Sequence, residues 1–130
     1  RTMTYRQLLG DLIAENGSYW ARQKDFGRAI RYYIIAVRLN PQAAEVYRML
    51  GHAYEQLARE YQTVTPARPS INLPVLQFTQ QLYAGYVRDY RQEAEAAFQR
   101  ADELGAAESL KQNYWLRQQE LAQTKREGQE

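Results

Sequence analysis

Apolar residues recur in the first third of the chain at the spacing of amphipathic helices. Two segments carry large apolar residues three, four or seven positions apart, which is the period of one helix face. These residues are Leu9, Leu12, Ile13 and Trp20 in the first segment, and Phe26, Ile30, Tyr33, Ile34 and Val37 in the second. Pro41 ends the second segment, because proline lacks an N–H and disfavours helical dihedral angles in the residue before it. The pattern predicts helices at about residues 4–23, 25–39 and 43–61.

An internal repeat with a period of 34 residues links the first and third of these predicted helices. A large apolar residue, a glycine and an aromatic residue return in the same order, as Ile13, Gly17 and Trp20 and then as Tyr47, Gly51 and Tyr54. The second predicted helix carries a small, aromatic, small pattern at Ala29, Tyr33 and Ala36. Small residues let two helices of a hairpin approach closely, and large rings fill the space that remains. The period and the pattern together resemble the tetratricopeptide repeat family.

This resemblance implies an all-α fold, a stack of antiparallel helix hairpins with about five or six helices in a single domain over residues 1–130. We expect a first repeat at residues 10–43 and a second repeat at residues 44–107, the second with an insertion at about residues 62–90. We expect a C-terminal capping helix at residues 107–127, because a repeat array needs a terminal unit with a polar outer face.

The insertion interrupts the second predicted hairpin. Residues 62–74 hold three of the four prolines, and the small, aromatic, small pattern returns only at Ala94, Phe98 and Ala101, which is 31 residues late. Residues 75–104 form either one long helix or, alternatively, a separate helix over residues 75–88 followed by a turn. Gly85 weakens the single-helix interpretation by about 1 kcal/mol. Gly105 predicts the end of this segment before the capping helix.

Composition and charge exclude several classes of protein. The chain has no cysteine and one histidine, so it lacks the ligands for cysteine zinc sites, iron–sulfur clusters and multi-histidine metal sites. No apolar run approaches the roughly 18 residues of a membrane-spanning helix. The net charge of +2 is far from the strongly basic balance of a dedicated nucleic-acid binder. We therefore expect no metal, no cofactor and no catalytic activity.

A polar patch on the predicted first helix of each hairpin is the candidate partner-binding site. In tetratricopeptide domains these helices line the concave surface, and the patch comprises Ser18, Arg22, Arg48, His52 and Glu55. A histidine close to a carboxylate also suits acid–base chemistry, but the sequence supplies no nucleophile beside it. The alternative to a partner-contacting groove is an ordinary solvated helix face.

Two further groups of residues are candidates for contacts. Tyrosine is unusually frequent, with 11 residues, and three of these lie on one side of the insertion, at Tyr83, Tyr86 and Tyr90. They either pack against the helix predicted at residues 43–61 or form an exposed aromatic strip that docks a partner. Basic residues recur along the outer side of the second predicted helix, at Lys24, Arg28, Arg31 and Arg38. This basic face either binds RNA or is an ordinary solvated surface.

The function predicted from the resemblance is a non-catalytic scaffold or adaptor that binds protein partners, as a subunit of a larger assembly. It would contact them through the concave helix face and the inserted segment. The alternative is an RNA- or ribonucleoprotein-associated module that uses the basic face. Peripheral association with a membrane complex is compatible with both. We expect a soluble protein of the cytoplasm, with the periplasm or a lumen left open if an N-terminal signal has been removed.

Overall fold

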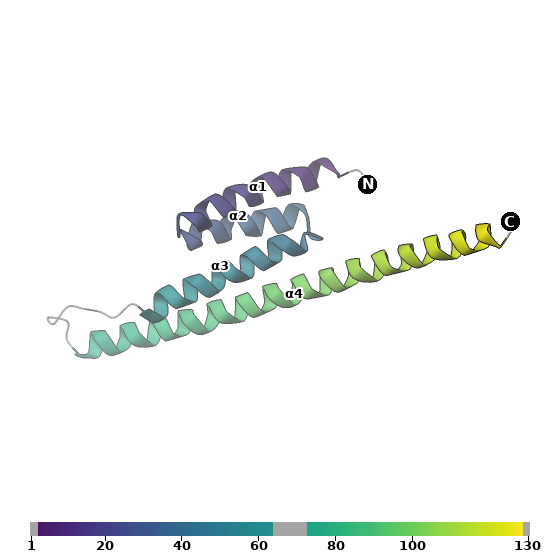
Figure 1. Ribbon diagram of the computed structural model, residues 1–130. Coiled ribbons are helices and arrows are strands. Elements are labelled where there is room, and N and C mark those ends of the chain that lie inside the picture. Colours follow the sequence, from purple (N-terminus) through teal and green to yellow (C-terminus); the bar gives the residue numbers. More distant parts are fainter. Residues whose placement is uncertain (1–2, 64–72, 129–130) are drawn as a thin grey trace.

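The computed structural model describes residues 3–63 and 73–128, and these residues form helices without any strand (Figure 1). Side chains are described throughout these ranges except at residues 108–111. The helices are α1 (Tyr5–Arg22), α2 (Phe26–Leu39), α3 (Ala44–Thr63) and α4 (Leu73–Glu127). The prediction of an all-α protein is confirmed, and the first three helices lie within two residues of their predicted bounds.

Local sequence signals set the beginning and end of the short helices. Thr4 starts α1 with a reciprocal capping box, in which its hydroxyl accepts from the backbone N–H of Gln7 and the Gln7 side chain accepts from the backbone N–H of Thr4. Asp25 caps α2 by accepting from the backbone N–H of Arg28 at 3.1 Å. Lys24, with a φ of 62°, makes the left-handed turn between α1 and α2.

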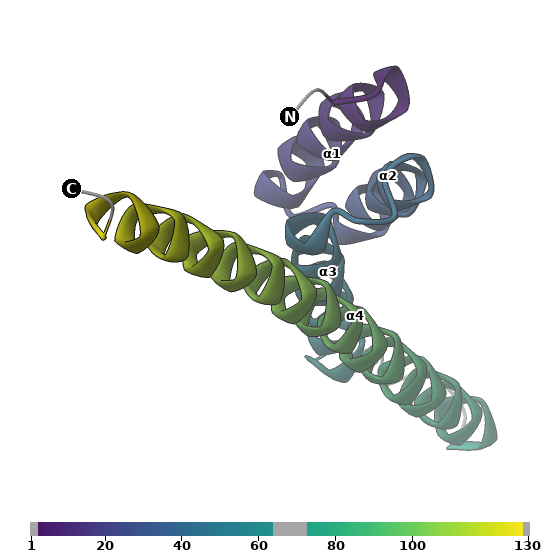
Figure 2. The same ribbon diagram turned by 90° about the vertical axis from the view of Figure 1, so that its right-hand side faces the viewer.

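The helices pack in the order in which they occur along the chain. α1 packs on α2, α2 on α3 and α3 on α4, whereas α1 meets α3 only marginally. Within the described residues α4 packs on α3 alone. Figures 1 and 2 show the result, a layer of three short helices with one long helix crossing its far edge.

The seams of the two helix pairs repeat the same packing. Ala29 and Ala36 of α2 are fully buried against α1, and on α4 the matching Ala94 and Ala101 are fully buried against α3. The large ring between the two alanines belongs to Tyr33 in the first pair and to Phe98 in the second. The short alanine side chains bring the backbones together, and each ring fills the space beside a glycine of the facing helix.

The core lies between α2 and α3 and extends along both seams. Its buried members other than Tyr33 are small and branched side chains, which include Ile30, Val37, Val46, Leu50 and Ala53. Half-buried rings and chains such as Trp20, Phe26 and Leu57 pack around them. Burial of this apolar surface, at about 25 cal/mol per Å², is what holds three short helices together. The core thus holds α1 and α3, the helices that carry the polar patch, in position.

Helix α4 decides one open alternative and corrects the predictions for the C-terminal part of the chain. α4 is a single helix of 55 residues, so the interpretation of residues 75–104 as one long helix is confirmed and the alternative of a turn after residue 88 is wrong. The predicted stop at Gly105 is also wrong, because α4 continues through it to Glu127. The expected capping helix at residues 107–127 is therefore the end of α4. The described residues form four helices instead of the predicted five or six.

The reason lies in the surroundings of Gly105. Its φ is negative, so it does not make the left-handed turn that ends many helices. A Cβ atom on this glycine would lie 3.3 Å from Nη2 of Arg48, so the end of the Arg48 side chain lies against α4 here. The cost of a glycine within a helix, about 1 kcal/mol, is offset by good helix formers on either side.

The predicted interruption at residues 62–74 is shorter than expected. α3 extends to Thr63, and α4 begins at Leu73 with Pro74 in its first turn, where proline is tolerated. The remainder of that prediction, residues 64–72, lies outside the described residues. The insertion thus lengthens both arms of the second helix pair.

Candidate partner-binding surface

A ridge of polar side chains on α3 organises the candidate site. Arg48, His52, Glu55 and Arg59 follow each other at helical spacings of four, three and four, which places them along one side of α3. A hollow lies on each side of this ridge, one toward α1 and α2 and one toward α4.

The hollow between α1, α2 and α3, which we call the apolar groove, has a volume of about 270 Å³. Its lining includes three of the predicted site residues, Ser18, Arg22 and His52, together with Gln56. Most of the remaining lining is apolar, formed by Ala21, Phe26, Tyr33, Met49 and Ala53. The groove therefore combines an apolar floor with a few polar groups at its rim, which is the usual composition of a ligand or peptide pocket.

Hydrogen bonds hold the floor of the apolar groove in place. The hydroxyl oxygens of Ser18 and Tyr33 lie 2.9 Å apart and share a hydrogen bond. Ser18 also donates to the sulfur of Met49 at 3.4 Å. Since Tyr33 is only 1% exposed, this bond satisfies a hydroxyl that has no access to water. Ser18 thus serves the structure of the groove.

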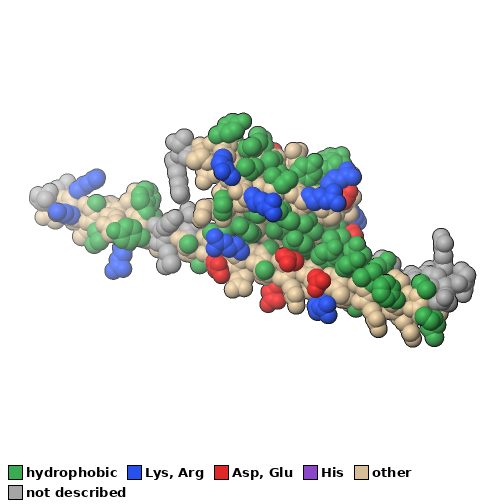
Figure 3. All heavy atoms as spheres, turned by 180° about the vertical axis from the view of Figure 1, so that it is seen from behind, with side chains coloured by type: hydrophobic (Ala, Val, Ile, Leu, Met, Phe, Trp, Pro, Cys, Tyr) green, Lys and Arg blue, Asp and Glu red, His purple; other side chains and the backbone are tan. Residues whose placement is uncertain are grey.

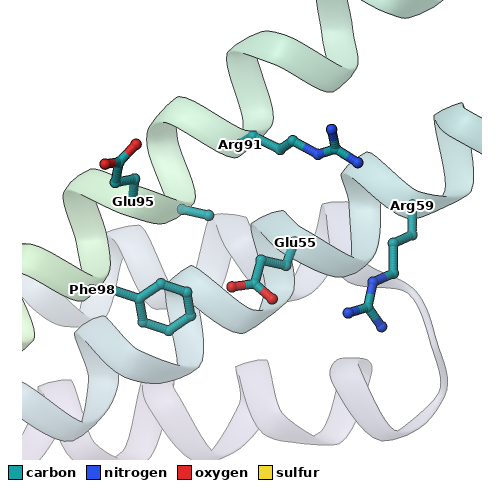
Figure 4. Close-up of a pocket in the computed structure, with 6 residues that line it drawn as sticks. Glu55, Arg59, Arg91, Glu95 and Phe98 are labelled. Atoms are coloured by element: carbon teal, nitrogen blue, oxygen red, sulfur yellow. The ribbon is translucent and has the colours of Figure 1, made fainter.

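The hollow between α3 and α4, which we call the charged hollow, has a volume of about 430 Å³. Its lining consists of Glu55, Arg59, Arg91, Ala94, Glu95 and Phe98 (Figure 4). Glu55 and Phe98 extend toward one another, and the guanidinium groups of Arg59 and Arg91 lie toward the other end. Arg91 donates from Nη2 to Oε1 of Gln62 at 2.7 Å. Two carboxylates and two guanidinium groups give this hollow a balanced charge.

The predicted polar patch is thus divided by the ridge. Glu55 belongs to the charged hollow, whereas His52 lines the apolar groove and stacks edge-on against Phe98 with 5.0 Å between ring centroids. Arg48 lines neither hollow. Its guanidinium pairs with the carboxylate of Glu45 at 3.5 Å and lies beside Gly105 of α4. Sequence analysis missed Arg59 and Arg91. The spacing of Arg59, four residues after Glu55, was the signal available for it.

The tyrosines of the insertion pack against α3. Tyr83, Tyr86 and Tyr90 surround the ring of Tyr61 with centroid distances of 5.3, 5.1 and 5.7 Å. Tyr90 also stacks on Tyr54 at 6.1 Å. Of the two interpretations of this strip, packing against the third helix is the one observed. The rings remain half-buried, so one edge of the cluster still faces solvent.

Burial also acts on the hydroxyls of this tyrosine cluster. The pKa of Tyr54 is raised above its ordinary value of 10.0. The main cause is desolvation by burial, and the negative charges of Glu93 and of an ionised Tyr90 add to it. Desolvation, followed by the neighbouring tyrosines and Asp89, raises the pKa of Tyr90 in the same way. Both phenols are therefore neutral at physiological pH and available as hydrogen-bond donors.

The predicted basic face is less uniform than its spacing suggests. The guanidinium of Arg28 lies 4.1 Å from the ring centroid of Trp20 and 3.5 Å from the carboxylate of Asp25. Lys24 lies in the turn before α2, and Arg38 in the last turn of that helix. Arg28 and Arg31 line a hollow of about 400 Å³ together with Trp20, Tyr32 and Ile35.

The described residues give His52 no acidic partner and hold no metal-binding cluster. His52 contacts Phe98 and has no carboxylate within hydrogen-bond distance. The described ranges hold no cluster of three side chains from His, Asp and Glu that a metal would need. Within the same ranges, no helix has the length and apolar character required to cross a bilayer. What this surface offers is shape, an apolar floor and charged rims.

Comparison with models of protein families, with curated proteins and with solved structures found no match to this chain.

Proposed function

We propose that this protein is a non-catalytic interaction module of tetratricopeptide-like architecture, which serves as a subunit of a larger protein assembly. The observation that carries the proposal is the apolar groove, in which Arg22 and His52 come together from α1 and α3 over the floor formed by Met49 and Ala53. A groove of this kind recognises a side chain of a partner and needs no reaction at the site.

The repeat supports the architectural part of the proposal. The 34-residue period relates α1 to α3, and the packing of Gly17 against Tyr33 returns as the packing of Gly51 against Phe98. The small, aromatic, small pattern returns with it on α4, after the 31 additional residues of the insertion. A helix pair that recurs with the same seam is the repeating unit of a helical array.

The chemistry of the apolar groove indicates the kind of partner. The thioether of Met49 is flexible and polarisable, so the floor adapts to apolar side chains of different shape. Arg22 at the rim is exposed and presents a planar cation that pairs with carboxylates. We infer a partner segment with one bulky apolar residue that enters the groove and one acidic residue that reaches Arg22. The charged hollow across the ridge extends the contact surface toward α4.

Affinity capture from the native source, with charge-altering variants as bait, tests this proposal. Arg22→Glu and His52→Glu both alter exposed side chains, so the fold is retained. We expect wild-type protein to retain a discrete set of proteins that both variants lose, with about a tenfold or greater reduction in recovery. Arg31→Glu is the matched control, since it reverses an exposed arginine on α2 outside the groove.

The same experiment distinguishes the proposal from the alternative function, RNA binding through the basic face. One observation favours that alternative, the hollow in which Trp20 and Tyr32 lie beside Arg28 and Arg31, because aromatic rings and arginines together stack on bases. RNA binding predicts recovery that is sensitive to nuclease and to salt and is lost in Arg31→Glu. Retention of the same proteins by Arg22→Glu would refute the proposed groove.

A further inference from the structure

Two apolar helix faces lie at opposite edges of the described structure, and neither is covered. The outer face of α1 carries Tyr5, Leu8, Leu12 and Tyr19, at spacings of three, four and seven residues that place them on one side of the helix. These side chains are 80%, 51%, 53% and 48% exposed. Single exposed apolar residues are ordinary, but four on one helix face form a continuous patch.

The repeat shows what kind of neighbour this face of α1 suits. Moved by 34 residues, Leu12 and Tyr19 correspond to Val46 and Ala53, which are buried on the side of α3 that packs against α2. The equivalent face of the third helix is therefore already a helix-binding face. On α1 that face has no helix against it within the described residues.

The second uncovered face belongs to the C-terminal part of α4. Leu104 is the last buried residue of α4, and every described side chain from Gln112 to Glu127 is exposed. Tyr114 and Leu121 lie seven residues apart on one side of the helix and are 68% and 58% exposed. Figures 1 and 2 show this segment extending past the three short helices, and Figure 3 shows hydrophobic side chains along it.

The two helical segments are similar in length, and their faces carry opposite charges. Residues 112–127 span about 24 Å of helix and α1 about 27 Å, at 1.5 Å per residue, so the segment is long enough to lie along α1. Glu15 lies three residues after Leu12 and four before Tyr19, in the middle of the α1 face. Arg117 holds the same position on α4, three residues after Tyr114 and four before Leu121. Each face thus carries one charged group at the same position, acidic on α1 and basic on α4.

A single chain does not bring these faces together, because α4 makes no contact with α1 in the described structure. We propose that two copies of this chain associate, with the C-terminal segment of α4 from each copy lying along the outer face of α1 of the other. The contact is made twice about a two-fold axis, which closes the assembly as a dimer. Doubling matters, because one helix–helix contact buries only part of the roughly 1,600 Å² of a standard interface.

Disulfide trapping tests this arrangement directly, since the chain has no cysteine of its own. Leu12→Cys and Leu121→Cys each place one thiol on an exposed site of one face. After mixing under mild oxidation, we expect a cross-linked species of twice 15.3 kDa that contains one copy of each variant. Each variant alone is expected to cross-link far less, because disulfides form only between Cα atoms within about 7 Å. Gln81→Cys, on the other arm of α4, is the control partner for Leu12→Cys.

A charge exchange provides the second measurement, in sedimentation equilibrium at several protein concentrations. We expect Glu15→Arg to weaken the dimer about tenfold, because it places like charges together at both contacts. Combining it with Arg117→Glu is expected to restore wild-type association. A wild-type chain that stays monomeric up to about 1 mM overturns the proposal. Cross-linking of either variant preferentially to itself also overturns it, because it would show pairing of like faces.

Discussion

The ring of Phe98 lies so close to Gly51 that a Cβ atom on this glycine would be 2.8 Å from it. Gly17 and Tyr33 have the same relationship in the first helix pair, also at 2.8 Å. No side chain fits at this distance without a shift of the neighbouring ring. Both glycines therefore determine how closely the helices of their pair approach, and both carry a ring of the facing helix.

Substitution of these glycines by alanine should destabilise the fold in a definite order. We expect Gly17→Ala to lower the free energy of unfolding by about 1–3 kcal/mol, because Tyr33 is buried and hydrogen-bonded and has no room to move. Gly51→Ala should lower the free energy of unfolding by less, because the partly exposed Phe98 is able to tilt toward solvent. Urea denaturation monitored by circular dichroism measures both values.

Gly27 is the matched control for this series, since a Cβ atom there would have nothing within 4 Å. Gly27→Ala should leave stability unchanged or raise it by up to about 1 kcal/mol, because alanine is the better helix former. A loss in Gly27→Ala as large as in the other two variants would show that the contacts with the rings are not the source of the loss.

The sequence carried enough information for the first three helices and their seams, because each depends on local signals. Capping residues, Pro41 and the 34-residue repeat act within a few turns of the positions they define. No such local signal marks the continuation of α4 through Gly105, which keeps a negative φ and lies against the side chain of Arg48 from α3. A glycine after an apolar position is equally typical of a helix end, so local propensity alone gave the wrong prediction.

Loss of the hydroxyl of Ser18 should destabilise the apolar groove from within. Ser18→Ala leaves the hydroxyl of the buried Tyr33 without its partner, and an unsatisfied buried polar group costs about 1–3 kcal/mol. A double-mutant cycle with Tyr33→Phe separates this effect from helix propensity. We expect the double variant to be more stable than the sum of the two single losses predicts. Strict additivity would mean that the hydrogen bond contributes nothing.

The candidate site was predictable only in part, for a related reason. Helical spacing placed Arg48, His52 and Glu55 on one side of α3, and this holds. Which neighbour each residue faces depends on how α1 and α4 lie on either side of that ridge, and periodicity within one helix does not contain this information. His52 lines the apolar groove, and Glu55 lines the charged hollow.

Tyr61 should be the residue on which the packing of the tyrosine cluster depends most. Its ring contacts three tyrosines of α4, and each aromatic pair contributes about 0.5–1.5 kcal/mol beyond area burial. We expect Tyr61→Ala to lower the free energy of unfolding by about 2–3 kcal/mol. It should also increase hydrogen exchange in the N-terminal turns of α4, which pack on little else. Phe78→Ala removes a ring of α4 that is 65% exposed, and should change stability by less than about 0.5 kcal/mol.

The tyrosine cluster should also make the fold sensitive to alkaline pH. The folded state raises the pKa of Tyr54 and Tyr90 above 10.0, so it holds their protons more tightly than the unfolded chain does. Their contribution to stability is therefore complete below about pH 10 and is lost as the pH rises through the raised values. We expect the free energy of unfolding from urea titrations to fall as the pH rises above about 10.

Replacing the two phenols identifies them as the source of that loss. Combining Tyr54→Phe with Tyr90→Phe should flatten the decline, because phenylalanine keeps the ring packing but has no proton to release. Tyr5→Phe is the control, since Tyr5 is 80% exposed and lies outside the cluster. Both variants replace tyrosine by phenylalanine, so the difference between their slopes reports on the cluster. An unchanged slope in the Tyr54 and Tyr90 double variant would assign the alkaline loss to other groups.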